Sequence, residues 1–127
     1  MAFSRRTLKL MPEEALQIQI MDWIQLQYPE IYDDVYHIAN ERKCNPYRGY
    51  ILKRMGVKPG IADIFVDVSR GTSPAYKGMW IELKSAKGKL TRAQTAFLER
   101  ERAKGYHCEC VNSFEAAVLL ITVYLSL

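Results

Sequence analysis

The segments IADIFVDV (residues 61–68) and MWIELK (residues 79–84) decide the fold of this chain, because both are apolar-rich runs that predict β-strands. Side chains alternate across a strand, so Glu82 and Lys84 share one face of the second strand. If the two strands pair, Asp63 joins them on that face. Two carboxylates and an ammonium on one face of apolar strands predict a functional site there.

These residue types suit a bound divalent cation and an activated water. Mg²⁺ prefers oxygen ligands and keeps several waters, so one or two carboxylates suffice to bind it. We predict Asp63 and Glu82 as metal ligands, with the backbone carbonyl of Leu83 as a third. Lys84 then orients or deprotonates the water that attacks a phosphodiester. The residues therefore predict hydrolysis of a nucleic acid backbone.

A solvated strand face is the competing interpretation of the same residues. Glu82 and Lys84 two positions apart also fit a surface ion pair, which contributes little to stability. Trp80 and Phe65 fall on the predicted faces of Glu82 and Asp63, respectively, and such aromatic residues argue against full solvation. The spacing alone leaves the two interpretations equally supported.

The charge distribution favours a polyanionic partner. The 127 residues predict one domain, 1–127, with residues 1–10 as a basic arm, and the net charge is +4. Basic residues gather in residues 40–58 and again after Glu82. Each lysine or arginine alone is equally compatible with solvated surface. The candidate DNA contacts are Asn40, Arg42, Lys43, Lys87, Lys89 and Arg92.

The three cysteines indicate a reducing compartment. Cys44, Cys108 and Cys110 form no paired framework and have no zinc-ligand spacing. We find no signal-peptide core and no apolar run near the length of a membrane span. We therefore expect a cytoplasmic protein that makes no membrane contact.

Periodicity and capping signals predict an α/β fold. We expect helices over 12–27, 47–55 and 91–104, a last helix capped by Asn112 or Ser113 and running to 125, and strands over 35–39, 61–68, 79–84 and 106–111. Thr91 and Gln94 fit a capping box at the start of the third helix. The resulting order, αβαββαβα, predicts a small mixed sheet with helices on its faces.

Several motifs then occur in the order of a known family. The stretch from Gly60 to Asp63 resembles a G-x-P-D motif, with Ala62 in place of proline. Glu82-x-Lys84 resembles an E-x-K strand, residues 87–94 resemble G-K-L-T-x-x-Q, and residues 14–17 resemble E-x-x-Q. The chain thus resembles the VRR-NUC (virus-type replication-repair nuclease) branch of the PD-(D/E)XK nuclease superfamily, in its small stand-alone phage or prophage form.

This resemblance implies a restriction-endonuclease-like fold, dependence on Mg²⁺ or Mn²⁺, and cleavage of DNA. It also implies a homodimer that acts on branched DNA such as four-way (Holliday) junctions. Glu14 on the first helix and Gln94 are implied to assist at the site. Glu14 equally fits a first-turn acid that stabilises its helix, as does Glu13. We expect that the Gln94 side chain cannot easily bond the helix cap and also face the phosphate.

We therefore predict a metal-dependent, structure-specific deoxyribonuclease of phage or prophage DNA replication, recombination or repair. Two alternatives stay open at this point. One is a nucleic-acid-binding module of the same fold that does not cleave, and the other is a ribonuclease of the same fold.

Overall fold

The computed structural model describes residues 12–39 and 45–127. The predicted basic arm and the predicted DNA contacts Asn40, Arg42 and Lys43 lie outside these residues. The predicted order of helices and strands is confirmed, with one added turn of 3₁₀ helix, η1. The elements are α1 (Pro12–Gln27), η1 (Tyr32–Asp34), β1 (Val35–His37), α2 (Pro46–Arg54), β2 (Ile64–Val66), β3 (Met79–Leu83), α3 (Arg92–Ala103), β4 (His107–Val111) and α4 (Phe114–Leu125).

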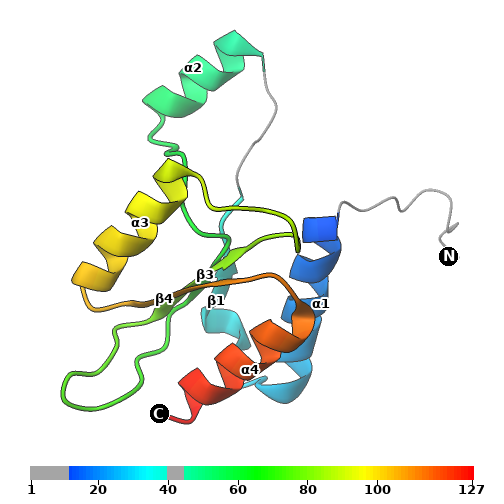
Figure 1. Ribbon diagram of the computed structural model, residues 1–127, viewed down its shortest axis with the longest axis vertical. Helices are drawn as coiled ribbons and strands as arrows, with labels where there is room; N and C mark the ends of the chain where they lie inside the picture. Colours follow the sequence, from blue (N-terminus) through cyan, green and yellow to red (C-terminus); the bar gives the residue numbers. More distant parts are fainter. Residues whose placement is uncertain (1–11, 40–44) are drawn as a thin grey trace, which may run out of the picture.

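The four strands form one mixed sheet in the order β1-β2-β3-β4. β1, β2 and β3 pair antiparallel, with Ile64 opposite Ile81. β4 pairs parallel to β3, with Glu82 opposite Cys110. The parallel pair needs a crossover connection, which α3 supplies. The predicted mixed sheet with helices on its faces is therefore confirmed (Figure 1).

The two faces of the sheet are covered by different helices. On one face, Ile64, Ile81 and Leu83 pack in a large apolar core with residues of α1 and α4, among them Ile20 and Ile121. On the other face a smaller cluster forms beneath α3, with the buried residues Ala62, Phe97, Leu98 and Cys108, and with Trp80 packed against them. Alternation along β3 separates the two sets of side chains.

Local signals fix the ends of α3. The hydroxyl of Thr91 accepts from the Gln94 N–H at 3.2 Å, and the Gln94 side chain accepts from the Thr91 N–H at 2.9 Å. This reciprocal pair is the predicted capping box. Gly105 follows the helix with φ +100°, a conformation that glycine adopts without strain. The start and end of α3 are thus set by the sequence around it.

Two details differ from the sequence prediction. β2 is shorter than the predicted strand 61–68, so Asp63 lies immediately before Ile64, the first residue of β2. β1, Val35–His37, is likewise shorter than the predicted strand over residues 35–39. Within the described part of the chain, no helix combines the length and apolar character that crossing a membrane requires.

Helix α2 has a different environment from the other three α-helices. None of its residues is buried, and it lies at the top of the molecule, away from the sheet (Figure 1). Asn45 caps it, because its side chain accepts from the Arg48 N–H at 2.7 Å. The helix is formed as predicted, but its side chains do not build the core.

Candidate active site

Asp63 and Glu82 lie opposite one another at the end of the β2–β3 pair. The antiparallel register pairs Ile64 with Ile81, and one further step brings Asp63 to Glu82 on the same face. Both residues are buried, with exposed fractions of 8% and 2%. Their carboxyl groups are close enough to share a hydrogen bond. The pair can therefore present oxygens to a single ion.

Backbone contacts hold Asp63 in place. Its carboxylate Oδ2 accepts from the Leu83 N–H at 2.7 Å. Its carbonyl accepts from the Ile38 N–H at 2.8 Å and from Nδ1 of His37 at 2.9 Å. Since a carbonyl can only accept, Nδ1 of His37 carries the proton in this contact. Asp63 is thus fixed by β1 on one side and by β3 on the other.

Glu82 receives two further contacts from polar side chains. Nε2 of Gln94 donates to Oε1 of Glu82 at 3.0 Å, and Nζ of Lys84 lies 3.8 Å from the same oxygen. Burial, and after it the charge of Asp63, raise the pKa of Glu82 to about 8, while Lys84 acts in the opposite direction. The raised pKa shows that the one nearby ammonium does not offset the burial of Glu82 and the charge of Asp63.

Gln94 serves the helix cap and the site at once. Its side-chain oxygen accepts from the Thr91 N–H, while its Nε2 donates to Glu82. One side chain bonds both the cap and Glu82, because the two ends of the amide point to different partners. The cap orients the amide, and the amide in turn orients Glu82.

The first helix brings acidic residues near this pair. The charge of Glu13 contributes to the raised pKa of Glu82, so Glu13 lies near enough for its field to act there. Glu14, the acid predicted to assist, is exposed at the N-terminal end of α1. One turn further, the side-chain amide of Gln17 is buried without a hydrogen-bond partner among the described residues. Sequence reasoning placed Gln17 in the E-x-x-Q stretch and Glu13 among the first-turn acids, but assigned a site role to neither.

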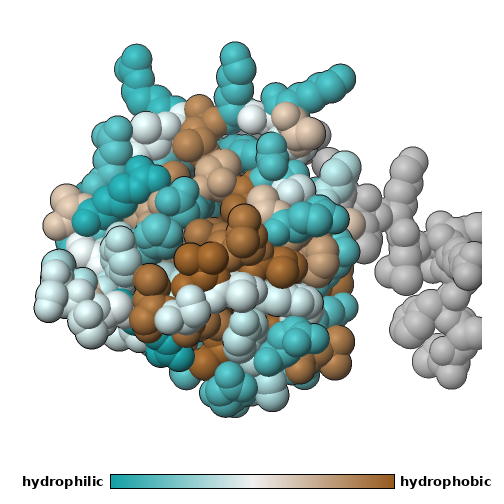
Figure 2. All heavy atoms as spheres, turned by 60° about the horizontal axis from the view of Figure 1, so that its bottom comes forward, coloured by the Kyte–Doolittle hydropathy of each residue, from teal (hydrophilic) through white to brown (hydrophobic). Residues whose placement is uncertain are grey.

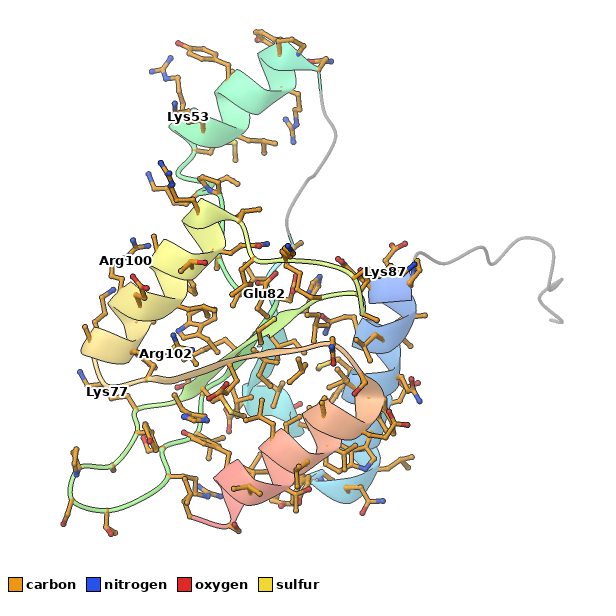
Figure 3. All side chains as sticks on the ribbon, in the orientation of Figure 1. Lys53, Lys77, Glu82, Lys87, Arg100 and Arg102 are labelled. Atoms are coloured by element: carbon orange, nitrogen blue, oxygen red, sulfur yellow. The ribbon has the colours of Figure 1, made fainter. Side chains whose placement is uncertain are left out.

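The predicted basic residues lie in and after the loop that follows β3. Lys87, Lys89 and Arg92 are all exposed. Figure 3 shows Lys87 on the loop beyond the end of β3 that carries Glu82. Cys110 on β4 is an exposed residue opposite Glu82, and the partial desolvation of its thiol together with the Glu82 charge raises its pKa. The neighbouring Cys108 is buried, and burial raises its pKa to about 11.

The fit of a divalent cation depends on the carboxylate pair. Within residues 12–39 and 45–127, no group of three or more histidine, cysteine, aspartate or glutamate side chains is arranged to hold a metal. Two adjacent, buried carboxyl groups do fit Mg²⁺, since a hard cation relieves their repulsion and its remaining ligands are commonly water. Asp63 and Glu82 are the side chains that would hold it.

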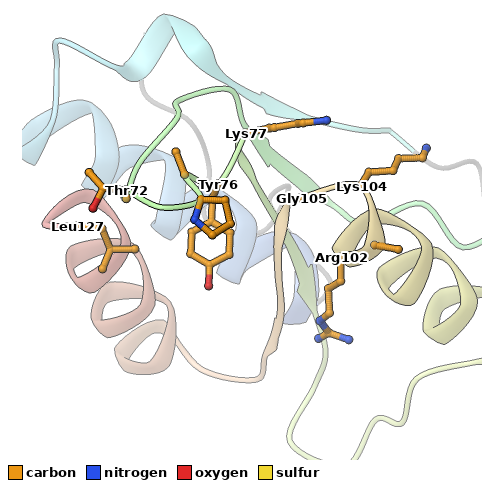
Figure 4. A pocket seen from close by; sticks show the side chains of 11 residues that line it. Thr72, Tyr76, Lys77, Arg102, Lys104, Gly105 and Leu127 are labelled. Carbon is orange, nitrogen blue, oxygen red and sulfur yellow. The ribbon is translucent and has the colours of Figure 1, made fainter.

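A separate pocket lies at the other end of β3. Its volume is about 740 Å³, and its lining includes Thr72, Tyr76, Lys77, Arg102, Lys104 and Leu127 (Figure 4). Arg102 donates to the Cys108 carbonyl at 2.8 Å, and Lys104 pairs with Glu101 at 2.7 Å. None of the predicted site residues lines this pocket, so we do not assign the site to it.

Comparison with solved structures identifies the fold. A structure named "VRR_NUC domain protein" superposes on this chain with a TM-score of 0.78 and 27% sequence identity, over 94% of this chain and 93% of the other. The predicted resemblance to the VRR-NUC family is confirmed. No family model and no curated protein matches the chain.

The VRR-NUC fold explains why the candidate residues meet. It places the end of the β2–β3 pair next to the start of α3, so Asp63, Glu82, Lys84 and Gln94 gather there. The Leu83 N–H binds Asp63, whereas the role predicted for the Leu83 carbonyl stays a prediction. Glu14, Lys87, Lys89 and Arg92 likewise stay predicted site and DNA-binding residues.

Proposed function

We propose that this chain is a metal-dependent deoxyribonuclease that hydrolyses phosphodiester bonds in branched DNA. The observation that carries the proposal is the buried Asp63–Glu82 pair, with Lys84 3.8 Å from Glu82. The name of the structural neighbour, which refers to a nuclease domain, supports the same activity class. We further propose a role inside the host cell in phage or prophage DNA replication, recombination or repair.

In this proposal Asp63 and Glu82 hold Mg²⁺ or Mn²⁺, with the Leu83 carbonyl as a further ligand. When bound, the cation supplies charge relief at the phosphate and lowers the pKa of water. Lys84 orients the attacking water or accepts its proton. Gln94 keeps Glu82 turned toward the site through its 3.0 Å contact, and Glu14 of α1 assists from the helix end.

Charge supports DNA as the partner. The exposed residues Lys87, Lys89 and Arg92 follow the strand that carries Glu82 and lie in a chain of net charge +4. Cations beside a carboxylate pair attract a phosphate backbone that the carboxylates alone would repel. We propose these three residues, together with Asn40, Arg42 and Lys43, as DNA contacts.

A homodimer is the second element of the proposal. Leu119 and Val123 on α4 are 66% and 51% exposed, although the opposite side of the same helix packs in the core. Figure 2 shows hydrophobic residues gathered in the middle of the face on which α4 lies. An exposed apolar patch of this kind is typical of a subunit interface. Two copies would present two sites to the two strands of a junction.

Incubation of a labelled four-way junction with MgCl₂ or with EDTA tests this function. We expect product only with the metal, and none from Lys84→Ala, whose affinity for the junction should match that of the unmodified protein. Matched RNA substrates separate the ribonuclease alternative, which predicts faster cleavage of RNA. Binding without any metal-dependent product would instead favour the non-cleaving module and overturn the proposal.

A further inference from the structure

Helix α2 carries a set of side chains that packing does not explain. Tyr47 and Tyr50 are 74% and 56% exposed, and no residue of the helix is buried. An isolated helix of nine residues is marginal in water, since its stability in a protein comes mainly from packing one face. Exposed tyrosines on such a helix indicate a surface that another molecule covers.

The charge of this segment favours a polyanion as that molecule. Residues 45–62 contain Arg48, Lys53, Arg54 and Lys58 and no aspartate or glutamate. All four cations are exposed. A second copy of the helix would bring like charges together, which opposes association. A DNA backbone supplies the complementary charge.

The aromatic rings add a second kind of contact. Tyr47 and Tyr50 are three residues apart and therefore neighbours on the helix surface. The guanidinium of Arg54 lies 5.7 Å from the centre of the Tyr50 ring, and its Nη1 donates to the Tyr50 hydroxyl at 3.4 Å. Exposed rings beside cations form the kind of platform on which unpaired bases stack.

The base of α2 is anchored to the helix that completes the site. Gly60 has φ +81°, and a Cβ there would lie 2.6 Å from the carbonyl carbon of Ala93 in α3. This close approach brings the chain between α2 and β2 against the first turn of α3, next to Gln94. Figure 3 shows Lys53 above the start of α3, on the side of that helix opposite its C-terminal end, with Glu82 and Lys87 lower down near the middle of the view.

We propose that α2 is a DNA-docking arm of the active site, whose cations bind phosphates and whose Tyr47 and Tyr50 stack on unpaired bases at a branch point. The inference rests on the proposed nuclease function and assigns a role in choosing the substrate to a helix outside the catalytic group. A fully paired duplex offers α2 phosphates only, whereas a branch with unpaired bases offers both contacts.

The test measures binding apart from cleavage. In the Lys84→Ala background, the affinities for a junction with an unpaired gap and for a duplex of equal length are measured by fluorescence anisotropy over a series of KCl concentrations. We expect Tyr47→Ala with Tyr50→Ala to weaken binding to the gapped junction by about 5- to 150-fold per stacked base and to leave duplex binding within about twofold.

A single-charge comparison tests the phosphate contacts. Lys53→Ala should weaken binding to both DNAs and reduce the slope of log K against log[KCl] by about 0.9. Lys77→Ala removes the same charge at the far pocket and should leave the slope unchanged. Both lysines are exposed and alanine favours helix, so circular dichroism should show all variants folded.

Three results would overturn the docking arm. The first is that the tyrosine variant binds the gapped junction as tightly as its parent does. The second is that Lys53→Ala and Lys77→Ala show equal slopes of log K against log[KCl]. The third is a changed sedimentation coefficient without changed DNA affinity, which would make α2 a contact between copies. Failure of the nuclease proposal has a different signature, because the unmodified protein would then show no metal-dependent cleavage.

Discussion

The two faces of β3 use neighbouring residues for opposite purposes. Met79, Ile81 and Leu83 enter an apolar core between the sheet and the helices α1 and α4. Trp80, Glu82 and Lys84 point to the other face, where Glu82 is buried beside Asp63 and Trp80 donates to Glu101 at 3.0 Å. Burying a carboxylate pair costs free energy that apolar residues would not cost. The first face thus supplies stability, while the second retains charge for chemistry.

Lys84→Ala should have the largest effect, and it should lower the rate of cleavage without changing stability, because Lys84 lies on the face of β3 that carries Glu82. Loss of a group that handles the proton of the attacking water lowers a rate by about 100- to 10,000-fold. The measurement is single-turnover cleavage of a labelled junction with saturating protein and MgCl₂. Lys77→Ala, which removes an equal charge at the other end of β3, is the control. A rate within about tenfold of the unmodified protein would remove Lys84 from the mechanism.

Ile81→Ala should lower stability without changing the rate of cleavage, because Ile81 lies on the apolar face of β3. Removing a fully buried isoleucine side chain costs about 2–5 kcal/mol of unfolding free energy, measured by urea denaturation. Ile81→Val, expected to cost about 0.5–1.5 kcal/mol, provides a variant that stays folded. Cleavage per folded molecule should be unchanged in both. A large loss of rate in folded Ile81→Val would mean that the two faces are coupled.

The pH dependence of stability should reveal the contribution of the face of β3 that carries Glu82. In the metal-free protein the pKa of Glu82 is raised from 4.5 to about 8, so between these values the folded state holds a proton that the unfolded state has released. Stability from this group is therefore complete below pH 4.5 and falls as the pH rises toward 8. In EDTA, the Tm should fall by several degrees more over this window than in Glu82→Gln, which cannot titrate. Parallel Tm curves would contradict a raised pKa of Glu82 in the folded protein.

The smallest effect is expected when the two residues of the capping box, Thr91 and Gln94, are replaced in turn. Thr91→Ala and Gln94→Ala each remove a cap contact, and each should cost about 1 kcal/mol of unfolding free energy. Only Gln94 also binds Glu82, so only Gln94→Ala should lower the cleavage rate and alter the pH profile of cleavage. Equal rates for the two folded variants would confine Gln94 to the helix cap.

Sequence patterns predicted the elements because their causes are local. The Thr91–Gln94 cap depends on residues three apart, and the alternation in β3 depends on a period of two. The meeting of Asp63 and Glu82 followed from assuming that two adjacent strands pair, which the register confirms.

The remaining features depend on contacts that no local pattern encodes. The charge of Glu13 acts on Glu82, and the sequence pattern could not separate Glu13 from Glu14, which is one step of about 100° further along α1. The two partners of the Gln94 amide come from different elements. The exposure of α2 depends on the tertiary arrangement of the other elements, none of which buries a residue of this helix.

The parallel register of β3 and β4 also has a practical use. It sets the exposed thiol of Cys110 beside Glu82, whereas the thiol of Cys108 on the same strand is buried. With Cys44 replaced by serine, a maleimide dye or nitroxide would attach at one position next to the carboxylate pair. Its emission or paramagnetic relaxation would then report, in real time and without a radiolabelled substrate, when a cation or a DNA strand arrives.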